Sequence, residues 1–137
     1  MYRLAVFDID GTLIDTERTG VESLVMTIRE LLGKEVPYGE AYKAFGIHIV
    51  CSEDTVRHKP HPEPLLHCVG LASKALGIPI RPDEVVFFGD TDHDFACARD
   101  AGCDFALADW KNRGWQNIPA RYKFSDAKEM EAVLFGS

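Results

Sequence analysis

Short apolar segments that end directly in acidic residues place the strongest limit on how this chain folds. Residues 3–7 form an apolar run of β-forming residues followed by Asp8, and residues 84–88 form a second run followed by Gly89 and Asp90. Runs of this length and composition are typical of strands buried in a parallel sheet, where both faces are covered. The chain is therefore expected to place several carboxylates at the ends of its strands.

Segments with helical periodicity alternate with the predicted strands. The predicted helices cover residues 19–32, 38–45, 65–76 and 92–101, with a last helix from an N-cap at Ser125 to Leu134, and further strands cover residues 48–51, 103–107 and 121–124. Such alternation predicts a three-layer α/β sandwich around a parallel sheet. At 137 residues the chain is expected to form a single domain, residues 1–137.

Charge and composition exclude several classes of function. A net charge of −7 argues against a nucleic-acid partner, which requires a basic surface. No stretch of about 18 or more apolar residues is present, so no membrane association is expected, and the N-terminal residues lack the apolar region of a signal peptide. The four cysteines form no Cys-x-x-Cys pair and suit neither a zinc site nor a disulfide framework. The sequence therefore predicts a cytoplasmic protein.

The residues that follow the strands predict a site for a cation and a phosphate. Ligands of parallel α/β sheets bind at the carboxyl ends of the strands, where Asp8, Asp10 and Asp90 would converge with Lys59. Three close carboxylates repel one another unless a cation such as Mg²⁺ binds them. A cation and a lysine together allow an anionic nucleophile to approach a phosphate dianion, and an aspartate can be that nucleophile. A second carboxyl group two residues later can carry the proton.

Three segments of the chain resemble motifs of the haloacid dehalogenase superfamily, in its phosphatase branch. The segment Phe7-Asp8-Ile9-Asp10-Gly11-Thr12-Leu13-Ile14-Asp15 is similar to the first motif, and His58-Lys59-Pro60-His61-Pro62-Glu63 is similar to the third. Phe88-Gly89-Asp90-Thr91-Asp92-His93-Asp94, followed by Ala101-Gly102, resembles the fourth. The segments occur in the family's order, and the resemblance covers most of the chain. It implies a Rossmann-like parallel sheet.

The resemblance also implies a role for each matching residue. Asp8 matches the nucleophile that becomes phosphorylated, and Asp10 matches the general acid/base whose backbone carbonyl binds Mg²⁺. Asp90 matches a carboxylate ligand of the metal, Asp94 matches a second ligand or a residue that holds metal-bound water, and Lys59 matches the lysine that balances charge. The implied phosphate-binding residues are Asp8, Ile9, Asp10, Gly11, Thr12 and Lys59, and the implied metal-binding residues are Asp8, Asp10, Asp90 and Asp94.

The activity that the resemblance implies is Mg²⁺-dependent hydrolysis of a small-molecule phosphomonoester through an aspartyl phosphate on Asp8. Asp10 favours a phosphatase, because dehalogenases of the family lack this second aspartate. Phosphoglycolate-type and sugar phosphatases are the nearest types. A phosphosugar mutase of the same superfamily, and a weak or inactive domain that binds Mg²⁺ or a partner, remain as alternatives. The substrate, the pathway and the oligomeric state are left open by the sequence.

One motif of the family has no match in this chain. The second motif supplies a Ser or Thr that binds the phosphoryl group, and several tens of residues that would contain it are absent between Ile47 and His48. Residues 16–47 then correspond to the remnant of a helical cap, and Ser52 is a weak substitute for the missing hydroxyl. Deletion of this segment would leave the first strand with an unpaired edge. Either a longer chain contains the missing segment, or the chain is this short and the strand 48–51 moves inward or a partner chain fills the gap.

Three further residues have two interpretations each. Asp92 is expected to be a helix N-cap or a surface residue rather than part of the site. Trp110 and Trp115 lie in the loop after the predicted strand 103–107, where they either pack on the edge of the sheet or border the site.

Overall fold

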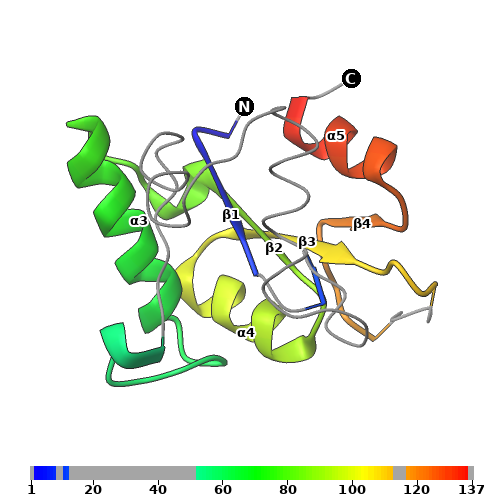
Figure 1. The fold of residues 1–137 in the computed structure, drawn as a ribbon, viewed down its shortest axis with the longest axis horizontal. Coiled ribbons are helices and arrows are strands. Elements are labelled where there is room, and N and C mark those ends of the chain that lie inside the picture. Colours follow the sequence, from blue (N-terminus) through cyan, green and yellow to red (C-terminus); the bar gives the residue numbers. More distant parts are fainter. Residues whose placement is uncertain (1, 9–10, 13–51, 113–116, 136–137) are drawn as a thin grey trace, which may run out of the picture.

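Four parallel strands form the sheet of this protein. The computed structural model describes residues 2–8, 11–12, 52–112 and 117–135. In the described part the strands lie in the order β1-β2-β3-β4, and each pairs in parallel with the next (Figure 1). The strands are β1 (Leu4–Phe7), β2 (Val85–Gly89), β3 (Asp104–Ala108) and β4 (Tyr122–Phe124). All four were predicted from the sequence to within one residue at each end.

Alternation of side chains along β2 builds a core on each face of the sheet. All five residues of β2 are buried. Val85 and Phe87 lie in the cluster that includes buried residues of two helices, whereas Val86 and Phe88 lie in the second cluster, on the opposite face. Successive side chains of a strand point to opposite faces, so a continuous apolar run is what a strand covered on both sides requires.

Three α-helices of the described residues cover the two faces. They are α3 (Glu63–Leu76), α4 (Asp92–Ala101) and α5 (Ala127–Phe135), and two short 3₁₀ helices are η1 (Ser52–Asp54) and η2 (Pro82–Glu84). Both α3 and α4 end at a glycine in the left-handed conformation, Gly77 and Gly102, whose backbone N–H groups bond the last turn of the helix. These are the glycines at which the sequence predicts the helices to end.

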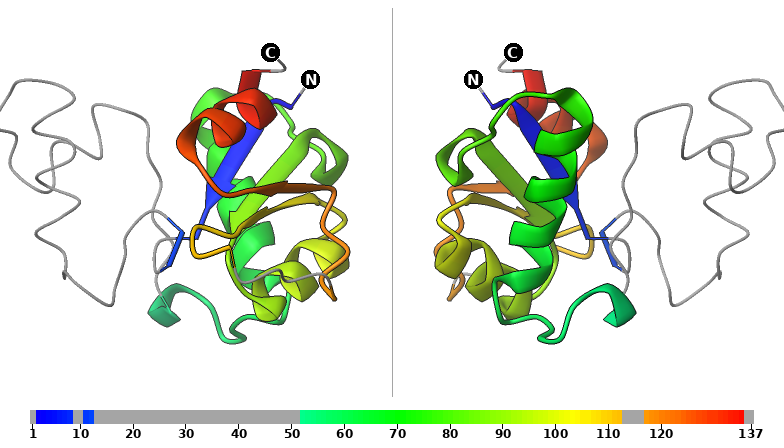
Figure 2. Two further views of the ribbon diagram at one scale, coloured as in Figure 1. Left: turned by 90° about the vertical axis from the view of Figure 1, so that its right-hand side faces the viewer. Right: turned by 90° about the vertical axis from the view of Figure 1, so that its left-hand side faces the viewer.

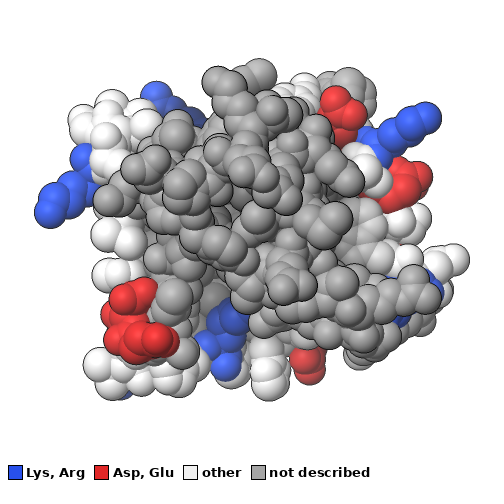
Figure 3. Space-filling model, viewed as in Figure 1, with Lys and Arg blue, Asp and Glu red and all other residues white. Residues whose placement is uncertain are grey.

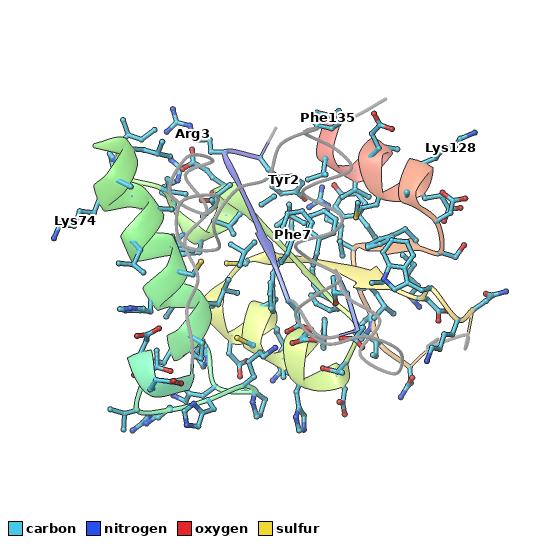
Figure 4. The ribbon with its side chains drawn as sticks, viewed as in Figure 1. Tyr2, Arg3, Phe7, Lys74, Lys128 and Phe135 are labelled. Atoms are coloured by element: carbon cyan, nitrogen blue, oxygen red, sulfur yellow. The ribbon has the colours of Figure 1, made fainter. Side chains whose placement is uncertain are left out.

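Helices α3 and α4 lie on one face of the sheet, and α5 lies on the other (Figure 1, Figure 2). Leu65 and Val69 of α3 pack with Cys97 and Ala98 of α4 against the sheet. Tyr2 and Phe7, labelled in Figure 4, belong to the cluster that α5 covers. Lys74 on α3 and Lys128 on α5 point away from the sheet on opposite sides of the molecule. The predicted three-layer α/β sandwich with a Rossmann-like sheet is therefore confirmed.

Strand β1 occupies one end of the described sheet. It pairs with β2, and all four of its residues are only partly buried, whereas those of β2 are fully buried. A missing segment between Ile47 and His48 is expected to leave the edge of the first strand unpaired. The predicted helices 19–32 and 38–45, the predicted strand 48–51 and the cap remnant 16–47 lie outside the described residues.

The predicted N-cap of α5 was wrong by one residue. Ser125 was expected to cap this helix, but Asp126 precedes Ala127 and its Oδ1 accepts a hydrogen bond from the backbone N–H of Glu129 at 2.8 Å. The Glu129 side chain instead reaches back to the backbone N–H of Ser125, at 2.7 Å. A carboxylate followed three residues later by a free N–H is the usual N-cap arrangement, and here Asp126 outcompetes the serine before it.

Helix length and the distribution of charge describe the surface of the described residues. None of the described helices is both long and apolar enough to cross a bilayer. On the face seen in Figure 3, acidic and basic side chains of the described residues lie around the rim, with both signs present.

Replacing Asp126 by Ala should lower the free energy of unfolding by about 1 kcal/mol, because the first turn of α5 loses its N-cap acceptor. Urea denaturation would measure the change. Ser125→Ala is the matched control and should have less than half that effect. A larger loss for Ser125→Ala than for Asp126→Ala would show that the serine caps the helix after all.

Candidate active site

The loop after β1 brings Asp8 to the carboxyl edge of the sheet. The backbone N–H of Asp8 donates to the carbonyl of Phe88 at 2.8 Å, which extends the pairing of β1 with β2 by one residue. Gly11 then adopts a φ of +77°, and a methyl group there would lie 2.1 Å from Oδ2 of Asp90. Glycine is required at this position for both reasons, and its absent side chain lets the two loops meet.

The loop after β2 positions Asp90 and begins helix α4. Thr91 is the N-cap, and its Oγ1 accepts from the backbone N–H of Asp94 at 3.2 Å. Oδ2 of Asp94 accepts in return from the backbone N–H groups of Asp90 and Thr91, at 3.1 and 3.2 Å, and from the Thr91 hydroxyl at 2.9 Å. This reciprocal capping box fixes the Asp94 side chain. Asp92, expected as an N-cap or a surface residue, is exposed and is not the cap.

Gly89 lets the capping carboxylate lie against the end of β2. A methyl group at Gly89 would lie 2.5 Å from Cβ of Asp94. Asp94 is 1% exposed, so its second oxygen, Oδ1, is also held away from bulk water. A buried carboxylate needs a charged or hydrogen-bonding partner for each oxygen, and the lysine of the neighbouring loop provides one.

Lys59 joins the carboxylates of the two strand ends. Its Nζ donates to Oδ1 of Asp8 and to Oδ1 of Asp94, both at 2.6 Å, and lies 5.9 Å from the centre of the Phe87 ring. The loop that carries Lys59 is closed by Glu63, whose carboxylate accepts from two backbone N–H groups at residues 56 and 57. Of the predicted convergence of Asp8, Asp10 and Asp90 with Lys59, the structure brings together Asp8, Asp90 and Lys59, and Asp10 lies outside the described residues.

The site carries more negative than positive charge. Burial raises the pKa of Asp8, and the charge of Asp94 raises it further against the opposing effect of Lys59. Burial, and then the charges of Asp8 and Asp94, raise the pKa of Asp90 to about 6. Burial alone would lower the pKa of Lys59, but hydrogen bonds and attraction from Asp8 and Asp94 raise it to about 12. One ammonium group does not balance three carboxylates.

The three carboxylates suit a divalent cation. One oxygen from each of Asp8, Asp90 and Asp94 lies within 4.8 Å of the other two. Mg²⁺ takes oxygen ligands, commonly one or two carboxylates together with water and phosphate. Asp94 already has Lys59 on one oxygen and backbone and hydroxyl donors on the other. Asp8 and Asp90 have fewer competing partners and are the better candidates for direct ligands.

The contacts of Thr12 with the carboxylates, and of Trp110 with Thr12, were not predicted from the sequence. Thr12 is buried, and its Oγ1 lies 3.5 Å from Oδ2 of Asp8 and 3.4 Å from Oδ1 of Asp90. The indole N–H of Trp110 donates to the backbone carbonyl of Thr12 at 2.9 Å. The Trp110 ring also packs edge-on against Phe124, with ring centres 5.1 Å apart. Trp110 therefore packs on β4 at the edge of the sheet and also contacts the loop that follows Asp8.

Several predicted site residues cannot be placed. Ile9, Asp10, Trp115 and the side chain of Ser52 lie outside the described residues. In the part of the chain that is described, the hydroxyl of Thr55 is buried without a hydrogen-bond partner.

Comparison with known families identifies the domain. The sequence profile of the family described as haloacid dehalogenase-like hydrolase matches residues 43–108, a range that contains Lys59, Asp90 and Asp94. The chain carries a haloacid dehalogenase-like hydrolase domain. This confirms the resemblance that the three motifs indicated.

Curated relatives of this domain have names of phosphate-hydrolysing enzymes. A candidate pyrophosphatase PpaX of Caldanaerobacter subterraneus is 32% identical over 106 residues, which cover 75% of this chain and 44% of that protein. A phosphoglycolate phosphatase of Salmonella choleraesuis is 38% identical over 55 residues, which cover 40% of this chain and 19% of that protein. The chain thus spans less than half the length of these relatives.

Solved structures of haloacid dehalogenase-like proteins share the fold. A candidate phosphoglycolate phosphatase from Lactobacillus plantarum matches with a TM-score of 0.59 and 18% identity, over 97% of this chain and 98% of that one. A phosphatase of the same superfamily from Thermococcus onnurineus matches with a TM-score of 0.55 and 20% identity, over 83% of this chain and 56% of that one. The first match shows that a solved fold of similar extent exists.

Replacing Asp90 by Asn should stabilise the metal-free protein at neutral pH. The folded-state pKa of Asp90, about 6, lies above its ordinary value of 3.8. A carboxyl group of this kind contributes stability below its unfolded-state pKa, and the contribution is lost as pH rises through the folded-state value. In EDTA at about pH 7.5 the variant should therefore melt higher than the wild type, by roughly 2–6 °C, and the difference should shrink near pH 4.

Asp92→Asn is the control, because it removes an exposed carboxylate two residues away on α4. It should leave the melting temperature unchanged or slightly lower at both pH values. A wild-type protein that melts higher than Asp90→Asn in EDTA at about pH 7.5 would contradict the account of repulsion among the carboxylates.

Proposed function

We propose that this protein hydrolyses a small-molecule phosphomonoester, with Mg²⁺, through an aspartyl phosphate on Asp8. The observation that carries the proposal is the pairing of Asp8 with Lys59 at 2.6 Å within a cluster of three carboxylates at the carboxyl edge of the sheet. The lysine lowers the repulsion between an anionic nucleophile and an anionic substrate. The names of the PpaX and phosphoglycolate phosphatase relatives support phosphate hydrolysis as the reaction class.

Asp8 and Asp90 would hold the metal through their carboxylates, with the backbone carbonyl of Asp10 as the ligand that the family resemblance adds. Bound Mg²⁺ would supply the positive charge that the three carboxylates lack and would orient the phosphate. Asp94 is proposed to support this centre mainly from outside, because it holds Lys59 with one oxygen and the Asp90 loop with the other. A role for Asp94 as a direct ligand remains the alternative.

The reaction would proceed in two displacements at phosphorus. In the first, a carboxylate oxygen of Asp8 forms a bond to phosphorus, the ester P–O bond breaks, and Asp10 gives its proton to the departing alkoxide. In the second, Asp10 takes a proton from a water molecule, the water oxygen attacks phosphorus, and the bond to Asp8 breaks. The products are the alcohol and inorganic phosphate, and both aspartates return to their starting protonation states.

Thr12 and Lys59 would keep the nucleophile ready for the first step. Lys59 binds Oδ1 of Asp8, and the Thr12 hydroxyl lies near Oδ2. These contacts restrict rotation of the carboxylate before substrate binds, so little ordering is left for the transition state. Lys59, which is held by Asp94 as well, could turn one of its three N–H donors to the incoming phosphate.

Pyrophosphate is the second candidate substrate, because the Caldanaerobacter relative that aligns with 75% of this chain is a candidate pyrophosphatase. The first displacement would be the same, with phosphate in place of the alcohol as the leaving group. The sequence also leaves open a phosphosugar mutase and a weak or inactive binding domain, the latter because no second-motif hydroxyl has been found. Loss of one such donor typically reduces the rate by about 10²–10³.

Turnover should require both Mg²⁺ and Asp8. With a panel of phosphomonoesters and pyrophosphate, the wild type should release phosphate with Mg²⁺ and none above background with EDTA. Asp8→Asn should lower the rate by at least roughly 10⁴-fold, because an amide cannot replace the nucleophile. Phosphate release is measured directly, and circular dichroism checks that the variant is folded.

Asp92→Asn serves as the carboxylate control and should keep the wild-type rate, because Asp92 is exposed and the ion pairs of Lys59 in the described part of the chain are with Asp8 and Asp94. Full activity of Asp8→Asn would refute the proposed nucleophile. No Mg²⁺-dependent turnover on any compound of the panel would favour the binding-domain alternative. Transfer of phosphate to a second position of a sugar phosphate, without release, would indicate the mutase.

A further inference from the structure

Trp110 lies in a turn that is bonded to β4, the last strand of the sheet. The backbone N–H of Asp109 donates to the carbonyl of Phe124 at 2.8 Å, and the N–H of Asn112 donates to the carbonyl of Asp109 at 2.9 Å. Asn112 has a φ of +48°, a left-handed conformation that asparagine tolerates better than most residues. The Trp110 ring packs on Phe124, which is itself buried in β4. The indole is therefore held by β4.

From this turn Trp110 reaches the loop of the proposed nucleophile. Its N–H donates to the backbone carbonyl of Thr12, a residue 98 positions earlier in the chain, at 2.9 Å. Thr12 is 3% exposed, and its hydroxyl lies within 3.5 Å of a carboxylate oxygen from both Asp8 and Asp90. The contact thus links the loop between β3 and β4 to the loops after β1 and β2, which carry Asp8 and Asp90.

Gly11, the residue before Thr12, gives the backbone of this loop conformational freedom. Its positive φ and lack of a side chain make the local backbone permissive. An aromatic donor that packs on Phe124 can restrict this backbone at low entropic cost, because an indole has only two side-chain torsions to order. Displacement of this loop by a fraction of an ångström would change the separation of Asp8 from Asp90.

We propose that Trp110 is a positioning residue for the site. Its indole N–H fixes the carbonyl of Thr12 and thereby the separation of Asp8 and Asp90 at which a cation and a phosphoryl group would bind. Trp110 contacts none of the reacting groups and acts through Thr12. The inference rests on the proposed function for its effect on turnover, but its effect on cation binding depends only on the carboxylate geometry.

The test compares Trp110→Phe with the wild type. Phenylalanine keeps a ring against Phe124 and removes the indole N–H. The variant should bind Mg²⁺ roughly tenfold more weakly by titration calorimetry, at the lower end of what loss of an outer-shell contact does at metal sites. At saturating Mg²⁺ it should lower kcat by about 5- to 20-fold with KM within about twofold, because the substrate still binds but the nucleophile is less well held.

Val69→Ala on α3 is the matched control for a structural effect alone. Val69 is buried in the cluster on the face of the sheet opposite to Phe124. This variant should melt at a lower temperature than Trp110→Phe, yet bind Mg²⁺ and turn over per folded molecule within about twofold of the wild type. Weaker Mg²⁺ binding in Trp110→Phe without a matching change in Val69→Ala would support positioning.

The outcomes separate this inference from the proposed function. Unchanged Mg²⁺ affinity and unchanged kcat in Trp110→Phe would overturn the positioning role while leaving the phosphatase proposal intact. A wild type that binds Mg²⁺ but hydrolyses nothing would remove the phosphatase proposal, and weaker Mg²⁺ binding by Trp110→Phe would still support the positioning role. A wild type that does not bind Mg²⁺ would overturn both.

Discussion

The ion pairs of Lys59 with two aspartates are the interaction on which the rest of this site depends. Lys59 lies between Asp8, at the end of β1, and Asp94, in the first turn of α4, at 2.6 Å from each. One oxygen from each of Asp8, Asp90 and Asp94 lies within 4.8 Å of the other two, so these carboxylates repel one another, and burying them unpaired would cost several kcal/mol. The single lysine offsets part of this repulsion and leaves a residual negative charge, which is the property that a cation-dependent phosphate site requires.

Asp94 shows how one side chain can support both the fold and the site. Its Oδ2 closes the capping box with Thr91, and its Oδ1 pairs with Lys59. The helix start, the Asp90 loop and the lysine are therefore fixed together. Gly11 and Gly89 complete the arrangement because a side chain at either position would collide with a site carboxylate. The geometry of the site thus depends on glycine at these two positions as well as on the charged residues.

The sequence predicted the described helices and strands of this fold, but few of the side-chain contacts between them. Helix α4 was predicted to the residue, Asp92–Ala101, because Gly102 ends its pattern. The N-cap of α5 was missed by one residue, since Ser125 and Asp126 are both good caps and only the position of Glu129 separates them. The Thr91-x-x-Asp94 spacing is itself a capping-box signal, and it predicts that Thr91 caps α4.

Contacts between segments far apart in the chain could not be predicted from the sequence. The bond from Trp110 to Thr12 joins residues 98 positions apart, and no local pattern specifies that an indole N–H reaches that carbonyl. The pairing of Lys59 with Asp94 likewise depends on how α3 and α4 pack. The expected convergence of carboxylates could be predicted because strand ends of a parallel sheet share one edge, whereas the partner of each oxygen could not.

The most direct test of the account is to look for the phosphoryl group on Asp8. Asp10→Asn incubated with Mg²⁺ and nitrophenyl phosphate, whose leaving group needs no proton, should release nitrophenol in a burst and accumulate a phosphorylated protein. Peptide mapping by mass spectrometry after acid quenching should place the phosphoryl group on Asp8. Sustained nitrophenol release with Asp8 unmodified, or with the phosphoryl group on another residue, would contradict the account.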